Sequence, residues 1–357
     1  MDLKEKFRAN FKEIIEKTGF SGKKFSVLVA CSGGADSLAL LYLLNEIKND
    51  FGFTLAAAYV NHRLRIEAAD EAIFVDKICQ QLEITYFSLN FEPDFWDHDT
   101  KNIEERARMK RYELLFNLVK SNKFGMLATA HHLDDQVETV LMRIFDRGTG
   151  IKGLSGIKPV NLSSDFLSNE KEGDFFVIRP MLDISKSEIS AFMQGRQFLS
   201  DASNYDTKYR RNYYRHEILP ALDKLLPEVP YKENITRLAE NAARESEIMR
   251  ELMDDFWRNL AAKDPENSIF IPRNIIKSKS YDFWLTAFSY LFSSTFFAES
   301  GNHRSHSTKT LHDIVDFIIK TDPATANYNP FVFERTRDGV KITSPLTPLQ
   351  CGEGKNS

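Results

Sequence analysis

The stretch KFSVLVACSGGADS, residues 24–37, joins a short apolar run to a turn that contains two glycines. Residues 24–30 are rich in apolar and β-branched side chains, which is typical of a strand buried on both faces of a parallel sheet. Apolar residues then recur at helical spacing through Leu38–Ile47. A buried strand, a tight turn and a helix together predict the first βα unit of an α/β fold.

The same alternation continues along the chain. Residues 3–17 form an amphipathic pattern before the first strand, and the later apolar runs and periodic segments alternate regularly. This spacing predicts a doubly wound, mostly parallel sheet with ligands at the carboxyl ends of its strands. The further strands are predicted at 54–60, 85–89 and 124–130, and the helices at 67–82, 103–121 and 134–145.

The pattern changes near residue 220, and the length of 357 residues favours more than one domain. We expect a larger α/β domain over 1–220 and a smaller, mainly helical domain over 221–344. The second domain begins with a long helix near 232–260 and ends in a hairpin of strands 331–335 and 340–343. Residues 345–357 are poor in apolar side chains, which predicts a frayed tail.

The overall charge is −4, from 47 basic and 51 acidic residues, which argues against a protein that coats nucleic acid or binds anionic membranes. Two segments depart from this balance. Residues 101–111 hold five basic and two acidic side chains, and residues 205–216 hold four basic and one acidic. The second segment interleaves its cations with tyrosines, a composition that suits RNA. The sequence therefore predicts local RNA contacts on an acidic protein.

The three cysteines, Cys31, Cys79 and Cys351, form no CxxC pair. This excludes a zinc ribbon, an iron–sulfur site of the usual spacing and a disulfide framework. The N-terminus lacks the apolar core of a signal peptide, and no apolar stretch is long enough to cross a membrane. We therefore expect a cytoplasmic protein without a membrane partner.

The turn after the first strand, Ser32–Ser37, has the composition of a phosphate-binding loop. Glycines let a backbone approach phosphate closely, and the following helix N-terminus supplies N–H donors and a favourable dipole. It is not a Walker loop, because GxxxxGK[ST] is absent and no lysine lies within it. The alternative is an ordinary strand–helix turn in which serine caps the helix. A literal GxGxxG at 148–153 follows a predicted helix, so it does not indicate dinucleotide binding.

The segment HHLDDQ, residues 131–136, combines two histidines and two carboxylates at the end of a predicted strand. Asp134 and Asp135 can hold magnesium or the positive amine of a nucleophile, and His132 can move a proton. The alternative is that one aspartate only caps the helix.

The basic segments contribute further candidates. In residues 101–111, Arg111 is the favoured phosphate or substrate contact and Arg108 is a second candidate. Solvated ion pairs are the alternative for this helix. In residues 206–216, Lys208, Arg211 and Arg215 are candidate RNA contacts, and the alternative is a helix that joins two domains.

Residues 32–37 match SGGxDS, and on these residues the chain resembles the N-type ATP pyrophosphatases, or PP-loop proteins, with an adenine nucleotide alpha hydrolase-like fold. More specific motifs resemble the tRNA(Ile)-lysidine synthases. They are YVNHRLR at 59–65, ERAR at 105–108, LATAHHLDDQ at 127–136, RPML at 179–182, DASN at 201–204 and RN at 211–212.

The resemblance implies roles for individual residues. ATP would be bound by Ser32, Gly33, Gly34, Ala35, Asp36 and Ser37, and Mg²⁺ by Asp36. The catalytic residues would be Asp36, Arg111, His132, Asp134 and Asp135. The contacts to tRNA or substrate would be Arg108, Lys208, Arg211 and Arg215. Residues 147–153 match a glycine-rich loop of the family, which we interpret as a mobile flap.

The resemblance also implies a two-step ligation. ATP adenylates the C2 carbonyl oxygen of the wobble cytidine in a CAU anticodon of tRNA(Ile), and free lysine then displaces AMP to form lysidine. A PP-loop tRNA thiolase is one alternative, but thiolases use paired cysteines. An amidotransferase-type synthetase would need a glutaminase. A non-catalytic RNA-binding relative would tolerate loss of the acids that are intact here.

Longer members of the family carry a further C-terminal domain that docks tRNA. If such a domain is missing here, we expect complete catalytic groups with reduced tRNA affinity or selectivity. The sequence does not determine the oligomeric state, and a homodimer is one of the alternatives.

Overall fold

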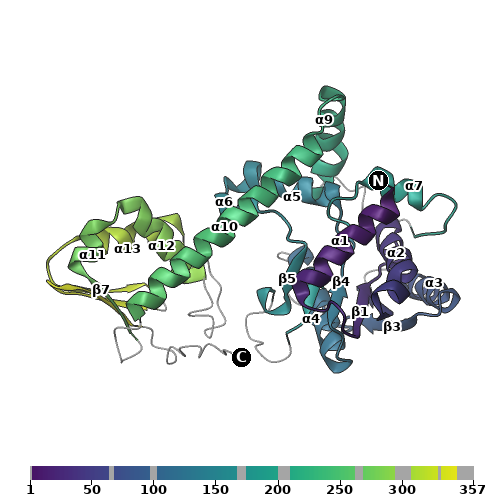
Figure 1. The fold of residues 1–357 in the computed structure, drawn as a ribbon, viewed down its shortest axis with the longest axis horizontal. Helices are drawn as coiled ribbons and strands as arrows, with labels where there is room; N and C mark the ends of the chain where they lie inside the picture. Colours follow the sequence, from purple (N-terminus) through teal and green to yellow (C-terminus); the bar gives the residue numbers. More distant parts are fainter. Residues whose placement is uncertain are drawn as a thin grey trace. The chain divides into compact units, whose positions relative to one another are not determined.

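The structure is a computed structural model that describes residues 2–63, 68–96, 103–166, 174–199, 210–261, 268–293, 307–328 and 331–343. The chain divides into two compact units, the first formed by residues 1–166 and 171–243 and the second by 167–170 and 244–357. The division falls inside the long helix α10 (Tyr231–Ala261), downstream of the boundary expected at residue 220 (Figure 1).

A six-stranded sheet forms the centre of the first unit, in the order β3-β2-β1-β4-β6-β5. All neighbours are parallel except β5, which runs antiparallel to β6. The strand order reverses between β1 and β4, so the carboxyl ends of these two strands border the crevice where doubly wound sheets bind ligands. The strands are β1 (Phe25–Ala30), β2 (Phe53–Asn61), β3 (Thr85–Asn90), β4 (Met126–Ala128), β5 (Val160–Leu162) and β6 (Phe176–Ile178).

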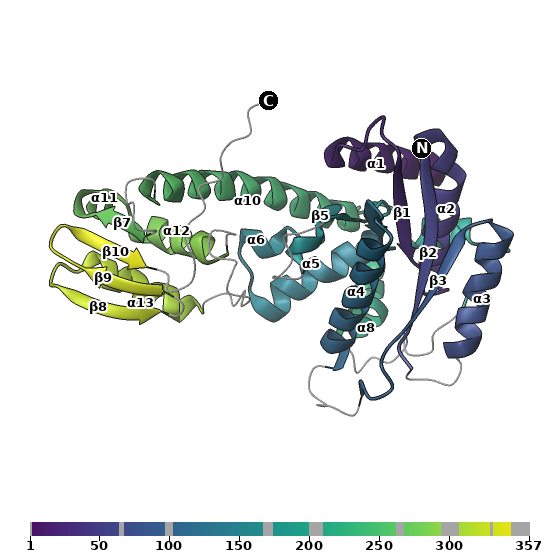
Figure 2. The same cartoon turned by 90° about the horizontal axis from the view of Figure 1, so that it is seen from below.

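Helices cover both faces of this sheet. Figure 2 shows α2 and α3 beside one face and α4 beside the other. Apolar side chains from β1 and α2 form a continuous core with α1, in which Phe7, Phe11, Val27 and Leu40 are fully buried. The helices that surround the sheet are α1 (Leu3–Thr18), α2 (Ala35–Phe51), α3 (Ala68–Gln81), α4 (Ile103–Ser121), α5 (Leu133–Arg147), α6 (Ile151–Leu154) and α7 (Lys186–Phe192).

The structure confirms the predicted α/β class and the first three strands to within one residue at each end. The fourth strand is shorter than predicted, since only Met126–Ala128 pairs with its neighbours. Strands β5 and β6 were not predicted from the sequence. Strands of three residues are too short to show a periodic pattern, and they form here because β6 pairs with β4.

The first unit continues through α8 (Arg210–Tyr213), the π-helical turn η3 (Tyr214–Ile218) and α9 (Leu219–Leu225) into α10. Tyr214, Leu219 and Tyr231 pack with Val137 of α5 in a small separate core. The segment that carries Arg211 and Arg215 is therefore fixed against α5 by apolar contacts.

The second unit contains a four-stranded antiparallel sheet, β7-β10-β9-β8, in addition to helices. The predicted hairpin is confirmed as β9 (Phe331–Arg335) and β10 (Gly339–Thr343). Strands β7 (Ser268–Pro272) and β8 (Ala324–Tyr328) were not predicted from the sequence. They pair with the outer edges of the hairpin, β7 with β10 and β8 with β9. Helices α11 (Arg273–Ser278), α12 (Tyr281–Ser293) and α13 (Thr308–Ile319) complete a core around Trp257 and Trp284. The predicted tail at 345–357 lies outside the described residues.

Within the described ranges, no helix combines the length and the apolar character that a membrane span requires.

Candidate active site

The phosphate loop, Ser32–Ser37, connects β1 to α2 as predicted. Gly33 has a φ of +80°, a left-handed conformation that residues with a side chain rarely adopt, so the turn favours glycine there. The Ser37 hydroxyl accepts a hydrogen bond from the Ser32 N–H at 3.2 Å and donates one to the Gly34 carbonyl at 3.0 Å. No side chain caps α2 at Gly34, which leaves its first turn available to an anion.

The HHLDDQ segment bridges β4 and α5, and His132 is the N-cap residue of α5. Asp135 accepts a hydrogen bond from the His132 N–H at 3.0 Å, the capping role that sequence reasoning left open for one of the two aspartates. His132 is 3% exposed. The N-terminus of α5 thus holds the imidazole inside the protein, next to the loop.

His132 lies among three carboxylates. Its Nε2 atom is 3.7 Å from Asp36 Oδ2 and 3.5 Å from Asp135 Oδ2, and its Nδ1 atom is 3.8 Å from Asp134 Oδ2. Burial alone would lower the pKa of His132, but these carboxylates together raise it above its ordinary value. The imidazole therefore favours its charged form and connects the phosphate loop to α5.

Asp134 ties three elements together rather than facing an open site. Its Oδ1 atom accepts a hydrogen bond from Lys232 Nζ at 2.8 Å, and its Oδ2 atom accepts one from the Lys186 N–H at 2.8 Å. Burial raises the pKa of Asp134, but Lys232 and the Lys186 N–H lower it more. Both oxygens are already engaged, so this arrangement favours a structural role for Asp134.

Asp135 and Glu138 form a second layer with two arginines. Arg211 and Arg215 each place Nη2 2.8 Å from Asp135 Oδ1. Their Nε atoms bond the two oxygens of Glu138 at 2.8 and 2.7 Å, and Glu138 is fully buried. The pKa of Asp135 is lowered although burial would raise it, because His132 and Arg211 are the strongest opposing charges. The predicted RNA contacts Arg211 and Arg215 thus have carboxylate partners within the protein.

Three further charged residues contact this site, Glu138, Lys186 and Lys232, and the sequence pattern assigned a role to none of them. Glu138 lies one helical turn after Asp134 and Asp135, so the i+3 and i+4 spacing was a usable signal. Lys186 and Lys232 carry no local signal, because each is brought to the site by an element remote in sequence. The carboxylate cluster is defined below as Asp36, Asp134, Asp135 and Glu138.

The two candidate arginines of α4 have aromatic or histidine contacts in place of the carboxylate partners that Arg211 and Arg215 have. Arg111 Nη2 is 3.0 Å from His62 Nε2 at the end of β2, and the Arg108 guanidinium lies 5.9 Å from the centre of the Tyr112 ring. Both are exposed, and neither forms an ion pair with a carboxylate among the described residues. Their charges are available to a bound anion. Lys208 lies outside the described residues.

The glycine-rich segment at 147–153 follows a helix, as the sequence indicated. Gly148 ends α5 with a φ of +55°, and α6 starts three residues later. Arg143 donates hydrogen bonds to the carbonyls of Gly153 and Gly156 at 2.7 and 2.9 Å. The interpretation of this segment as a mobile flap stays a prediction.

His131 is held in the neutral form. Burial lowers its pKa to about 3, with Asp135 opposing the shift and Arg179, Arg211 and Arg108 adding to it. Its Nδ1 atom lies 3.0 Å from Thr129 Oγ1. The pKa values of the two adjacent histidines therefore shift in opposite directions, since burial lowers that of His131 and nearby carboxylates raise that of His132.

Stability is expected to fall as the pH is lowered from 6.5, because His131 is neutral when folded and protonated when unfolded. Because its pKa is lowered in the folded state, the unfolded state binds more protons than the folded state between about pH 6.5 and 3. The free energy of unfolding therefore falls by about 1 kcal/mol for each pH unit in this range. Thermal unfolding of wild type and His131→Asn between pH 7 and 4.5 measures this effect. The melting temperature of His131→Asn should fall less steeply with decreasing pH than that of wild type. Parallel plots of melting temperature against pH would contradict the prediction.

The donor set fits one kind of magnesium site. Mg²⁺ usually takes one or two protein carboxylates and completes its shell with phosphate oxygens and water. Asp36 is one-third exposed at the edge of the loop, and the described residues contain no group of three or more His, Cys, Asp or Glu ligands. These residues fit an ion that arrives with the phosphates rather than a cage formed by the protein alone.

Comparisons with known proteins identify the family of this chain. Residues 3–222 match the family model of the PP-loop domain. The chain is 36% identical over 211 residues to the tRNA(Ile)-lysidine synthase of Clostridioides difficile strain 630, covering 58% of this chain and 43% of that protein. It is 36% identical over 234 residues to the tRNA(Ile)-lysidine synthase of Thermosipho africanus, covering 65% of this chain and 51% of that protein. It is 35% identical over 218 residues to the tRNA(Ile)-lysidine synthase of Petrotoga mobilis, covering 60% of this chain and 64% of that protein.

The chain therefore spans between 43% and 64% of the length of these curated relatives. Among solved structures, the U34-tRNA thiolase NcsA of Methanococcus maripaludis is similar in fold, with a TM-score of 0.50 at 22% identity, covering 66% of this chain and 80% of that one. The family model covers more than half of the chain, and its matched residues include the phosphate loop and the carboxylate cluster. The chain belongs to the PP-loop family.

Proposed function

We propose that this protein is a cytoplasmic enzyme that uses ATP to join free lysine to C2 of the wobble cytidine in a CAU anticodon of tRNA(Ile), which makes lysidine. The observation that carries the proposal is the meeting of the phosphate loop with the α5 N-terminus, where His132 Nε2 lies 3.7 Å from Asp36 Oδ2. The similarity to lysidine synthases supports the choice of reaction.

The first step is transfer of the adenylyl group to the base. The cytidine O2 attacks the α-phosphorus, the bond between the α-phosphorus and its bridging oxygen breaks, and pyrophosphate leaves. The first turn of α2, which no side chain caps, would hold the departing phosphates. Asp36 would hold a magnesium ion, which would neutralise charge on the pyrophosphate. Arg108 and Arg111 add positive charge that no described carboxylate neutralises.

The second step joins lysine. Its neutral ε-amine attacks C2, the new C–N bond forms as the C2–O bond to AMP breaks, and the amine gives up a proton. Asp134 and Asp135 were predicted to position either metal or lysine. Because their oxygens are engaged by Lys232, the Lys186 N–H and the two arginines, binding of lysine at either aspartate would require one of these pairs to open.

A tRNA thiolase is the second candidate, and the fold similarity to NcsA concerns the fold alone. Cys31 and Cys79 are both buried, and burial raises the pKa of both thiols, that of Cys79 to about 12. Protonated, inaccessible thiols are poor sulfur carriers. Cys351 lies outside the described residues. The described cysteines therefore favour the ligase.

The proposed function is tested by incubating the protein with ATP and radiolabelled lysine. A tRNA(Ile) transcript with a CAU anticodon should gain label, and the same transcript with UAU should not, because the reacting cytidine is absent. A tRNA(Met) transcript, which shares the CAU anticodon, tests selectivity. Absence of label in both CAU transcripts, with folded protein that binds ATP, would refute the function.

A further inference from the structure

Lys186, the first residue of α7, links the phosphate loop to α5. Its ammonium group donates a hydrogen bond to the Asp36 carboxylate, and its backbone N–H donates one to Asp134 Oδ2 at 2.8 Å. The side chain is 46% exposed. The backbone of Lys186 is therefore anchored, while its charged end lies beside the loop with access to solvent.

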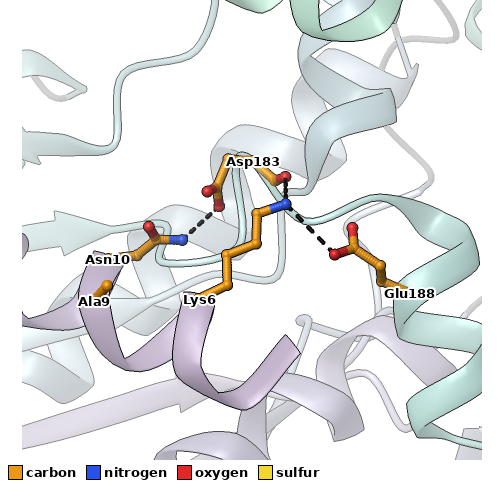
Figure 3. Close-up of a pocket in the computed structure, with 5 residues that line it drawn as sticks. All are labelled: Lys6, Ala9, Asn10, Asp183 and Glu188. Carbon is orange, nitrogen blue, oxygen red and sulfur yellow. Dashed lines mark hydrogen bonds and ion pairs between the residues drawn. The ribbon is translucent and has the colours of Figure 1, made fainter. Parts of the chain in front are cut away.

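Contacts from α1 hold the start of α7 in place. An open pocket of about 420 Å³ separates the two elements, and Figure 3 shows Lys6 and Asn10 reaching across it. Lys6 Nζ donates to the Asp183 carbonyl at 2.5 Å, and Asn10 Nδ2 donates to the Pro180 carbonyl at 3.1 Å. Glu188 then accepts from the Ser185 N–H at 2.7 Å and closes a capping box. These contacts fix where the Lys186 backbone lies.

The phosphate loop itself has no positively charged side chain. Walker loops carry a lysine that reaches the β- and γ-phosphates, and a phosphate anion gains most from a donor that is itself charged. Lys186 is the lysine that the structure brings to Asp36 in this loop, although it lies 150 residues away in sequence. A lysine side chain has a flexible stem and three donors, so it can exchange one anionic partner for another.

We propose that Lys186 is a phosphate-binding residue that takes the place of a loop lysine. It pairs with Asp36 in the free protein, and it moves to the phosphate oxygens of ATP or released pyrophosphate when these occupy the loop. The exchange leaves the Asp36 carboxylate available to a cation that accompanies the phosphates. The inference rests on the nucleotide-binding part of the proposed function and not on the identity of the tRNA.

The first test measures the binding of inorganic pyrophosphate to the full chain by calorimetry in the absence of divalent metal. Lys186→Ala should raise the Kd about tenfold or more, because a charge-assisted hydrogen bond is lost. Lys186→Arg should stay within about threefold of wild type. Adenosine, which has no phosphate, should bind all forms equally.

Lys4→Ala is the matched control, since Lys4 also pairs with an acid of α2, Glu46 at 2.9 Å, but at a distant position on the helix. Its Kd for pyrophosphate should equal that of wild type. Lys186→Gln provides a second variant if Lys186→Ala does not fold. Unchanged pyrophosphate affinity in a folded Lys186 variant would overturn the proposal.

A double variant separates phosphate binding from simple neutralisation of Asp36. If Lys186 only neutralises Asp36, then Asp36→Asn removes the need for it, and Asp36→Asn/Lys186→Ala should bind pyrophosphate as well as Asp36→Asn. If Lys186 contacts phosphate, the double variant should bind about tenfold more weakly than Asp36→Asn. Equal affinities would overturn the proposal.

The two proposals fail in different experiments. If the wild-type protein transfers no lysine, the proposed function is refuted. The pyrophosphate measurement uses neither tRNA nor lysine, so it still tests the role of Lys186. Conversely, lysine transfer that persists together with unchanged pyrophosphate binding in Lys186→Ala would refute the role of Lys186 alone.

Discussion

Asp36→Asn is expected to lower the rate of lysine transfer to tRNA(Ile) by about a hundredfold or more, which corresponds to about 2.7 kcal/mol of transition-state stabilisation. Asp36 is the acidic residue of the phosphate loop, and its side chain is one-third exposed. Burial raises the pKa of Asp36, but His132 and Lys186 lower it more, so the carboxylate is charged at neutral pH. Asparagine keeps the shape and removes the charge that a cation needs.

The measurement is pyrophosphate release and lysine incorporation at saturating ATP and at several Mg²⁺ concentrations. Asp50→Asn is the matched control, because Asp50 lies near the other end of α2 and pairs with Arg8 at the surface. The control should release pyrophosphate at the wild-type rate. Undiminished release by Asp36→Asn would remove both the metal assignment and the catalytic role of this residue.

Glu138→Gln is expected to destabilise the α5 region by about 3 kcal/mol, the usual range for breaking a buried charge pair. Glu138 is fully buried and accepts hydrogen bonds from Arg211 and Arg215 at 2.8 and 2.7 Å. Both arginines are partly exposed, so water can solvate them after the change, and this keeps the expected loss at the lower end of that range.

Because the chain has two compact units, the effect is best measured locally, as hydrogen exchange of α5 amides. Protection of α5 should fall about a hundredfold in Glu138→Gln. Glu217→Gln changes an exposed carboxylate of the same π-helical turn as Arg215. It should alter the free energy of opening of α5, as measured by hydrogen exchange, by less than about 0.5 kcal/mol. Wild-type protection in Glu138→Gln would show that the pairs contribute nothing to stability.

The predictions that held from sequence rest on local patterns. The β1 strand, the glycine turn and the α2 helix each follow from a contiguous run of residues, and the structure places them where the sequence indicated. The structure places the HHLDDQ segment at the sheet edge where β1 also ends, because parallel strands on either side of the switch point share that edge. Where predictions failed, β5 and β6 are only three residues long, and β7 and β8 are the outer strands that pair with the predicted hairpin.

The partners of the charged residues could not be read from the sequence. Lys186 and Lys232 reach Asp36 and Asp134 from 150 and 98 residues away, and no pattern within a helix or a strand encodes such a contact. The sequence also could not show that Arg211 and Arg215 bind carboxylates of α5, since their interleaving with tyrosines equally suits RNA.

By itself, therefore, the sequence determined the α/β class, the phosphate loop and the residue types that meet beside it, since propensity, periodicity and glycine conformation act over a few residues. Only the tertiary structure decided in which direction the pKa of each group at the site is shifted. His131 and His132 are adjacent in sequence, yet burial beside arginines lowers the pKa of the first and three carboxylates raise that of the second. That difference depends on neighbours that folding brings together.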